Sequence, residues 1–158
     1  MLDKPNDVRS GGKSRSDDIV RLWLSLSTCE RSIEQQLRSH VNAKYGITLP
    51  QFELLCEMDN SNGPVVMTRL SEQLHVTGSN ITGIVDRLEG KGLVKRFRSH
   101  VDRRVQHIRM TTLGNAEYKE IAADVMVYLT DTLSELTDEE VTALDKLLNK
   151  TRRSASKT

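Results

Sequence analysis

The stretch from Pro64 to Thr111, PVVMTRLSEQLHVTGSNITGIVDRLEGKGLVKRFRSHVDRRVQHIRMT, decides the fold of this chain. After a short apolar run, the spacing of apolar residues predicts a compact helix over 68–74 and a second helix over 79–89, joined by a turn over 75–78. The second helix has small polar side chains early and apolar ones late. Two short helices separated by a tight turn are typical of a helix-turn-helix.

A basic hairpin follows the second helix directly. The pattern predicts strands over 93–98 and 105–110, joined by a tip over 99–104. Helix, turn, helix and basic β-hairpin, in that order, indicate a winged helix-turn-helix. The fold class that we predict is therefore mainly α with a small β-wing, flanked by helices on both sides.

Long helical patterns precede and follow this unit. The first helix is predicted to begin near Ser16, whose side chain can cap free N–H groups, and to end before Gly46 as the C-cap. Thr111 can cap the helix after the hairpin, and Thr137 with Glu140 forms a capping box for the last helix. Each flanking helix has an apolar face and no domain of its own in which to bury it, which predicts a homodimer.

These elements divide the chain into successive regions. We expect a disordered tail over 1–15, helical dimerisation segments over 16–45 and 112–150, a winged helix-turn-helix DNA-binding domain over 46–111, and a basic tail over 151–158.

Charge is segregated along the chain. The net charge is +1 over 158 residues, but residues 86–111 hold eight Lys and Arg against three acids, whereas residues 112–149 hold two against nine. A local basic excess at a winged helix indicates a nucleic-acid partner. The apolar runs are too short to span a membrane, and the N-terminus lacks a secretory segment. Cys29 and Cys56 have no paired spacing, which indicates a reducing compartment, so we expect a cytoplasmic protein.

In a helix-turn-helix, the second helix presents its first residues to base edges in the major groove of double-stranded DNA. Asn80 can bond the paired donor and acceptor of adenine, and neighbouring hydroxyls can bond bases or phosphates. Arg87, Lys91 and Lys95 suit phosphates, which position a protein without reading sequence. The DNA contacts that we predict before the wing tip are Thr77, Gly78, Ser79, Asn80, Thr82, Arg87, Lys95 and Arg98.

The wing tip adds two arginines after an acid. A guanidinium at a hairpin tip suits a narrow minor groove, where the negative potential is enhanced. We expect Arg103 to be inserted into this groove. The carboxylate of Asp102 would be repelled by DNA, so we expect Asp102 to stabilise the turn through an ion pair with Arg104 as its structural partner.

Longer motifs give a family resemblance. Three motifs resemble the MarR family of transcriptional regulators: TGIVDRLEGKGLV over 82–94, Asp102-Arg103-Arg104, and RMTTLG over 109–114. The resemblance in the order and length of the elements covers about residues 17–150. The resemblance implies a homodimer, a winged helix-turn-helix, binding to a pseudo-palindromic operator and release by a small ligand. The wing departs from the common pattern, since Arg98-Ser99-His100 stands where acidic and proline residues are frequent.

The resemblance also bears on the effector. Segments 21–24, 48–54 and 77–83 are similar to the branch that controls aromatic-acid catabolism, some members of which recognise a CoA thioester. An aromatic acid needs an apolar slot and a cation. Trp23 is the candidate for the slot and Arg31, Arg38 or His40 for the cation, although Trp23 also suits a dimer core and the arginines also suit solvent or ion pairs.

The sequence gives less support to other functions. A thiol-based redox-sensing repressor needs a reactive cysteine, but Cys29 lies beside Glu30 and Cys56 lies on an apolar stripe, so both are interpreted as structural. The histidines do not cluster at metal-ligand spacing, so no metal and no cofactor are expected. Motifs of enzyme catalysis are lacking, which predicts a protein that is not an enzyme. A winged-helix protein-interaction module remains an alternative.

Overall fold

The computed structural model describes residues 14–61, 63–74, 76–99 and 105–155. The chain separates into two compact units, Met1–Gln36 and Leu37–Thr158, and each is described by itself. The elements in order are α1 (Arg15–Tyr45), α2 (Leu49–Asn60), β1 (Val65–Val66), α3 (Met67–Gln73), α4 (Gly78–Gly90), β2 (Val94–Arg98), β3 (Gln106–Met110), α5 (Thr112–Thr132) and α6 (Asp138–Ala155). This is the mainly α fold with a small wing that the sequence predicts.

The first unit consists, in its described part, of the first turns of α1. The helix begins at Arg15, one residue before the predicted start. Ser14 and not Ser16 stands at its N-terminus: the Ser14 N–H donates to Asp17 Oδ2 at 3.1 Å, and Ser14 Oγ accepts from the Ser16 N–H at 3.3 Å. The prediction of a Ser16 cap is therefore wrong, because Ser16 is already helical. Apolar side chains of this segment remain exposed, Trp23 by 62%.

The second unit begins with the end of α1 and the turn into α2. Gly46 adopts φ +62°, the left-handed conformation that glycine tolerates at a helix C-cap, as predicted. The Gln51 side chain accepts a hydrogen bond from the Thr48 N–H at 2.8 Å, which fixes the start of α2.

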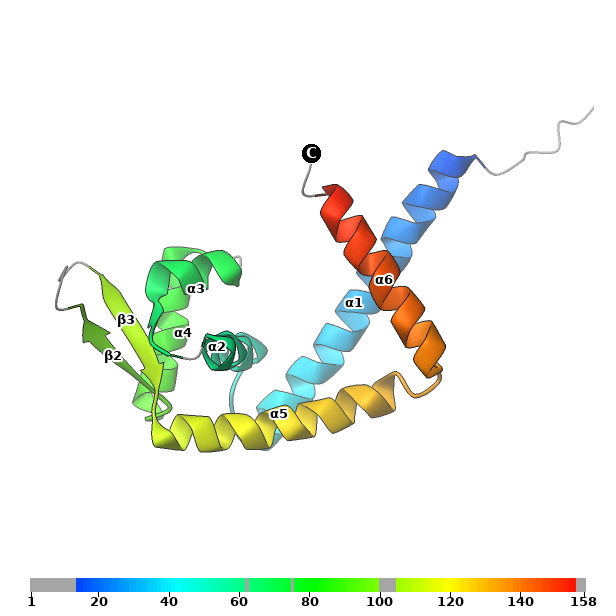
Figure 1. Ribbon diagram of the computed structural model, residues 1–158. Coiled ribbons are helices and arrows are strands. Elements are labelled where there is room, and N and C mark those ends of the chain that lie inside the picture. Colours follow the sequence, from blue (N-terminus) through cyan, green and yellow to red (C-terminus); the bar gives the residue numbers. More distant parts are fainter. Residues whose placement is uncertain (1–13, 62, 75, 100–104, 156–158) are drawn as a thin grey trace, which may run out of the picture. The chain divides into compact units, whose positions relative to one another are not determined.

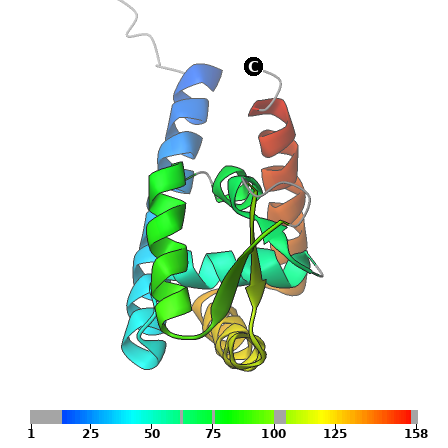
Figure 2. The ribbon, with the colours of Figure 1, turned by 90° about the vertical axis from the view of Figure 1, so that its left-hand side faces the viewer.

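The helix-turn-helix and the hairpin pack as one body. Figure 1 shows α2, α3 and α4 gathered beside the strands β2 and β3, with α5 running below α2; Figure 2 looks onto the hairpin with α4 beside it. Their core is formed by apolar residues from every one of these elements. It includes Leu54, Leu55, Leu70, Ile81, Val85, Leu88, Leu93, Val94, Ile108 and Ile121, all of them at most 2% exposed.

The sheet has three antiparallel strands in the order β1-β3-β2. Val65 lies opposite Ile108, and Arg96 lies on the other side of Ile108. The apolar run at Pro64–Met67 therefore contributes a short third strand that the sequence pattern does not predict. That strand ties the start of α3 to the hairpin.

The hairpin passes into α5 through a close backbone contact. Thr111 caps α5 as predicted, because its Oγ1 accepts from the Gly114 N–H at 2.9 Å, and the Thr111 N–H donates to the Leu93 carbonyl at 3.0 Å. Gly114 lies so near the strand that a Cβ atom there would stand 1.9 Å from Leu93 O. Glycine is required at this position for a steric reason.

The last helix leaves its apolar side chains uncovered in the single chain. Thr137 and Glu140 form the predicted capping box, with bonds of 2.9 and 3.3 Å. Val141, Leu144 and Leu147 are 44–62% exposed. The helix continues to Ala155, so residues 151–155 of the predicted basic tail 151–158 are helical. Favourable charge explains the extension, since Arg152 and Arg153 lie at the negative end of the helix dipole.

The buried residues of α5 are Gly114, Ile121 and Val125. Leu113 on the same helix and Leu133 at its C-cap are 51% and 39% exposed. Within the described residues, no helix combines the length and the apolar character that a membrane crossing requires.

Replacement of Gly114 by alanine tests the contact between α5 and the hairpin. Gly114→Ala should lower the free energy of unfolding by about 1–3 kcal/mol, because the added methyl group forces the helix away from Leu93. Urea denaturation followed by circular dichroism measures this change. Gly90→Ala is the matched control, since a Cβ there meets no atom within 4 Å, and it should change stability by less than about 1 kcal/mol. Equal stability of the two variants would contradict the steric account.

Candidate nucleic-acid interface

The first turn of α4 presents small polar side chains to solvent. Thr77, Gly78, Ser79, Asn80 and Thr82 are all exposed. Thr77 is also the helix N-cap: its Oγ1 accepts from the Asn80 N–H at 3.4 Å and lies 3.1 Å from Ser79 Oγ. Thr77 therefore has a structural role as the cap of α4. The Asn80 side chain extends from the helical turn that this cap stabilises.

The opposite face of α4 is anchored in the core. Ile81, Ile84, Val85 and Leu88 are each at most 3% exposed. These positions recur at helical spacing, so the polar first turn and the buried stripe lie on different sides of the helix. Burial of one side thus presents the other, as the sequence predicts.

Arg96 joins the hairpin to α4. Its guanidinium forms ion pairs with Asp86 and, at 3.1 Å, with Glu89 Oε2. Its backbone N–H donates to Glu89 Oε1 at 3.0 Å. The side chain is only 21% exposed, so it connects strand and helix and has little surface left for DNA. Sequence reasoning counted Arg96 only as part of the basic excess, because its partners lie seven and ten residues earlier on another element.

The remaining predicted cations occupy different faces. Arg87 is exposed, and its Nε donates to the Gly83 carbonyl at 3.1 Å within α4. Arg98 is exposed near the end of β2 and lies on the same side of the strand as Arg96, whereas Lys95 lies on the other side. The structure therefore does not place Lys95 with Arg98. Arg103 and Arg104 lie outside the described residues.

Two exposed side chains near Lys95 were not singled out as site residues by the sequence analysis. Arg109 lies directly opposite Lys95 across the strands, and Phe97 lies opposite His107 with ring centroids 5.6 Å apart. Strand alternation was the available signal, since it places Lys95, Phe97, His107 and Arg109 on one face of the hairpin.

The predicted effector residues are divided between the two units. Trp23 and Arg31, both exposed, belong to the first unit, and Arg38 and His40 belong to the second. His40 is already engaged: its Nε2 lies 2.6 Å from Asp124 Oδ2, and its ring stacks on Tyr128 with centroids 4.2 Å apart. A carboxylate of the protein thus occupies the position that a carboxylate ligand was expected to take at His40.

Asp124 contacts two side chains at the end of α1. Lys44 Nζ forms an ion pair with Asp124 Oδ1, while His40 bonds the other oxygen. These hydrogen bonds, from Lys44 first and His40 second, lower the pKa of the Asp124 carboxyl below its usual value. The same contact raises the pKa of Lys44. The contacts of Asp124 with Lys44 and His40 hold α5 against the last turns of α1.

The two cysteines differ in surroundings. Burial raises the pKa of Cys56 to about 11, so its thiol stays protonated at neutral pH, and the side chain packs against the core. Burial also raises the pKa of its neighbour Tyr118 to about 12. Cys29 is exposed on α1. Among the described residues, no group of three or more His, Cys, Asp and Glu side chains is arranged to hold a metal ion.

Comparison with known proteins agrees with this geometry. The family model "MarR family" matches residues 47–105. A relative in Bacillus subtilis (strain 168), the uncharacterized HTH-type transcriptional regulator YsmB, is 30% identical over 137 residues, which cover 85% of this chain and 90% of that protein. This chain belongs to the MarR family.

Other known proteins are similar to this chain over most of their length. The HTH-type transcriptional repressor MdtR of Bacillus subtilis (strain 168) is 29% identical over 129 residues, 82% of each protein. The crystal structure of a MarR mutant from E. coli complexed with operator DNA has a TM-score of 0.75 and 25% identity, covering 88% of this chain and 99% of that chain. As a MarR family member, the chain is a transcription regulator with a DNA-binding winged helix, and not an enzyme.

The Asp124 contact predicts a pH-dependent stability in this MarR family protein. Because the carboxyl pKa is lowered on folding, Asp124 stabilises the fold above the ordinary pKa of about 3.9, and this contribution is lost as the pH falls below that value. Asp124→Asn should therefore be less stable than the parent at pH 7, and the difference should shrink towards pH 3. Urea denaturation at several pH values measures it.

The control for this experiment is Glu120→Gln, an exposed acid on the same helix. It should leave stability almost unchanged at each pH. A difference between Asp124→Asn and the parent that is constant with pH would show that charge is not the cause.

Proposed function

We propose that this regulator is a homodimeric repressor, which binds a pseudo-palindromic operator and is released by a small aromatic carboxylate or its CoA thioester. One observation carries the DNA-binding part: the capped, exposed first turn of α4 is held by a buried face and by Arg96 beside a basic hairpin. Helices of this kind insert their first residues into the major groove. The likeness to a MarR protein complexed with operator DNA supports the same mode of binding.

Exposed apolar side chains support the homodimer. The last helix exposes Val141, Leu144 and Leu148 at helical spacing, and α1 exposes Ile19, Leu22 and Trp23. Burying such faces against a second copy removes apolar area from water. Two copies related by a twofold axis would present two α4 helices about one turn of DNA apart, which suits an operator with two half-sites.

Repression and ligand release rest on relatives and on resemblance. A relative of similar length is named a transcriptional repressor, and resemblance to the aromatic-acid branch suggests the class of effector. Binding of an effector would lower operator affinity if it favoured a dimer whose two α4 helices no longer match the half-site spacing. The raised pKa of Cys56 gives no support to thiol-based sensing at that residue.

The proposal is tested by fluorescence anisotropy with the full chain. The titration compares the DNA upstream of its own gene with a scrambled duplex at several salt concentrations. We expect a preference of about 10³-fold or more for the upstream DNA and a steep fall of affinity with salt. Equal, weak binding to both would contradict a specific regulator of its own gene and favour a protein-interaction module.

The effector is tested separately in the same assay. Benzoate, hydroxybenzoates, cinnamates and their CoA thioesters are added to the preformed complex, and release is expected for at least one of them. If none releases DNA, the effector class is wrong while the DNA-binding result stands.

Substitution of Asn80 tests direct base reading. Asn80→Ala should lose discrimination at one A·T position of the operator by about 1–3 kcal/mol, because the amide can bond adenine at two atoms. Binding to a panel of single-base operator variants measures this effect. Asn60→Ala, at the exposed end of α2, is the control and should keep the parent's discrimination. Undiminished discrimination by Asn80→Ala would exclude base reading by this side chain.

A further inference from the structure

The hairpin face turned away from α4 places two positive charges directly opposite each other. Lys95 on β2 pairs in register with Arg109 on β3, and both side chains are exposed. Like charges at directly opposed positions of an antiparallel pair are destabilising. The nearby acids Asp86 and Glu89 are bound to Arg96 on the other face of the strand. Within the described part of the chain, neither Lys95 nor Arg109 has an ion pair.

A pocket opens beside this pair. It has a volume of about 490 Å³ and is located where β3 passes into α5. It is lined by Lys95, Arg109, Met110, Thr111, Thr112 and Asn115. A pocket of this size lies within the range of sites for small ligands.

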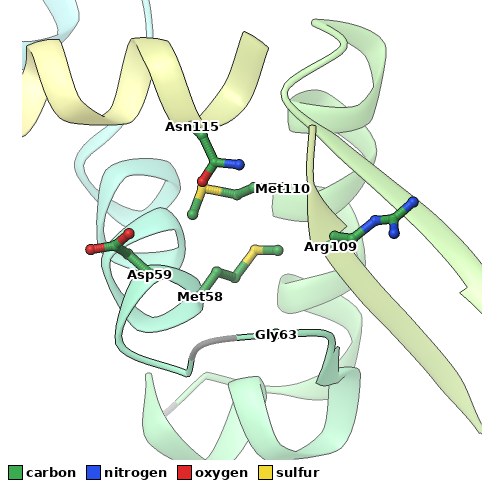
Figure 3. Close-up of a pocket in the computed structure, with 6 residues that line it drawn as sticks. All are labelled: Met58, Asp59, Gly63, Arg109, Met110 and Asn115. Atoms are coloured by element: carbon green, nitrogen blue, oxygen red, sulfur yellow. The ribbon is translucent and has the colours of Figure 1, made fainter. Parts of the chain in front are cut away.

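The direction of Arg109 distinguishes this pocket from its neighbour. A second pocket of about 280 Å³ is lined by Met58, Asp59, Gly63, Arg109, Met110 and Asn115. Figure 3 shows the Arg109 side chain running away from Met58 and Met110. Its guanidinium lies 5.9 Å from the centroid of the Phe97 ring, so cation–π attraction holds it on the face that carries Lys95. The larger pocket is therefore the cationic one.

We propose that Lys95, Arg109 and Thr112 form a phosphate-binding pocket at the base of the wing. The lining includes an ammonium group from β2, a guanidinium from β3 and the exposed Thr112 hydroxyl from the first residue of α5, and these donors suit the tetrahedral oxygens of a phosphate. A bound phosphate would also offset the repulsion between Lys95 and Arg109. This pocket lies on the opposite side of β2 from Arg96 and Arg98, so it is separate from the surface of α4.

Calorimetric titration of the full chain with inorganic pyrophosphate, at constant ionic strength and without DNA, tests the pocket. We expect one saturable site in the parent and a loss of affinity of about tenfold or more in Lys95→Gln/Arg109→Gln, because each substitution removes a charged hydrogen-bond donor. Lys119→Gln/Lys146→Gln makes the same change of net charge at exposed positions outside the pocket, and its affinity should stay within about twofold of the parent. Equal losses in both double variants, or no saturable binding by the parent, would overturn the proposal.

Thermal unfolding provides a second measurement, which also shows whether the double variant is folded. Without anion, the melting temperature of Lys95→Gln/Arg109→Gln should be close to that of the parent, because removal of the repulsion offsets the loss of the contact between Arg109 and Phe97. Pyrophosphate should raise the melting temperature of the parent and not that of the double variant. An equal rise in both would overturn the assignment to these residues.

The phosphate can belong to DNA that flanks the operator or to a phosphorylated small molecule. If it belongs to DNA, the double variant should lose more affinity for a long duplex than for one that ends at the two half-sites. If it belongs to a small molecule, any loss of DNA affinity in the double variant should be the same for both duplexes, and pyrophosphate should change the DNA affinity of the parent alone. Either result identifies the source, and the calorimetry stands independently of the proposed repressor function.

Discussion

The bonds of Arg96 to Asp86 and Glu89 are the constraint on which the DNA-binding surface depends. A hairpin alone has many orientations relative to a neighbouring helix. Here the guanidinium binds both acids of α4, and the Arg96 N–H adds a bond to the same Glu89 carboxylate. With Val94 and Ile108 buried behind it, Arg96 sets the wing at one position beside α4. The capped first turn of α4 and the basic strand are thereby presented together.

A second constraint ties this unit to the helices that follow. Thr111 Oγ1 donates to the Gly92 carbonyl at 2.7 Å and also caps α5, while Gly114 brings α5 against the Leu93 backbone. Farther along α5, Asp124 binds His40 and Lys44 at the end of α1. These contacts form a continuous physical connection from the wing base to the last turns of α1. Such a connection is what the proposed effector would need in order to alter the spacing of the two α4 helices.

Local signals in the sequence predicted much of this arrangement. The caps at Thr111 and Thr137, the glycine end of α1 and the two-faced character of α4 each depend on neighbours within four residues, and all are confirmed. The wing strands followed from the residue pattern over 93–98 and 105–110, and the structure has them at Val94–Arg98 and Gln106–Met110. The domain division remains a prediction.

Contacts between residues that are distant in the sequence could not be predicted from such local signals. His40 was one of three candidates to bind the carboxylate of an effector, but its acid partner in the protein lies 84 positions later, and no local pattern indicates that contact. The strand β1 has two residues, too few for alternation to show. The proximity of Arg109 to Lys95 depends on the register of β2 and β3, which places the two residues opposite each other. Partners across elements depend on tertiary packing, which a single sequence does not display.

Hydrogen exchange measured by mass spectrometry, with and without DNA from upstream of the gene, tests most directly whether α4 and the wing bind as one unit. The first N–H groups of a helix have no intrahelical partner and exchange rapidly unless something covers them. The account predicts slower exchange on DNA binding both in segment 77–82 and in β2 near Arg98. Slower exchange confined to one of these two segments, or found only in α6, would contradict it.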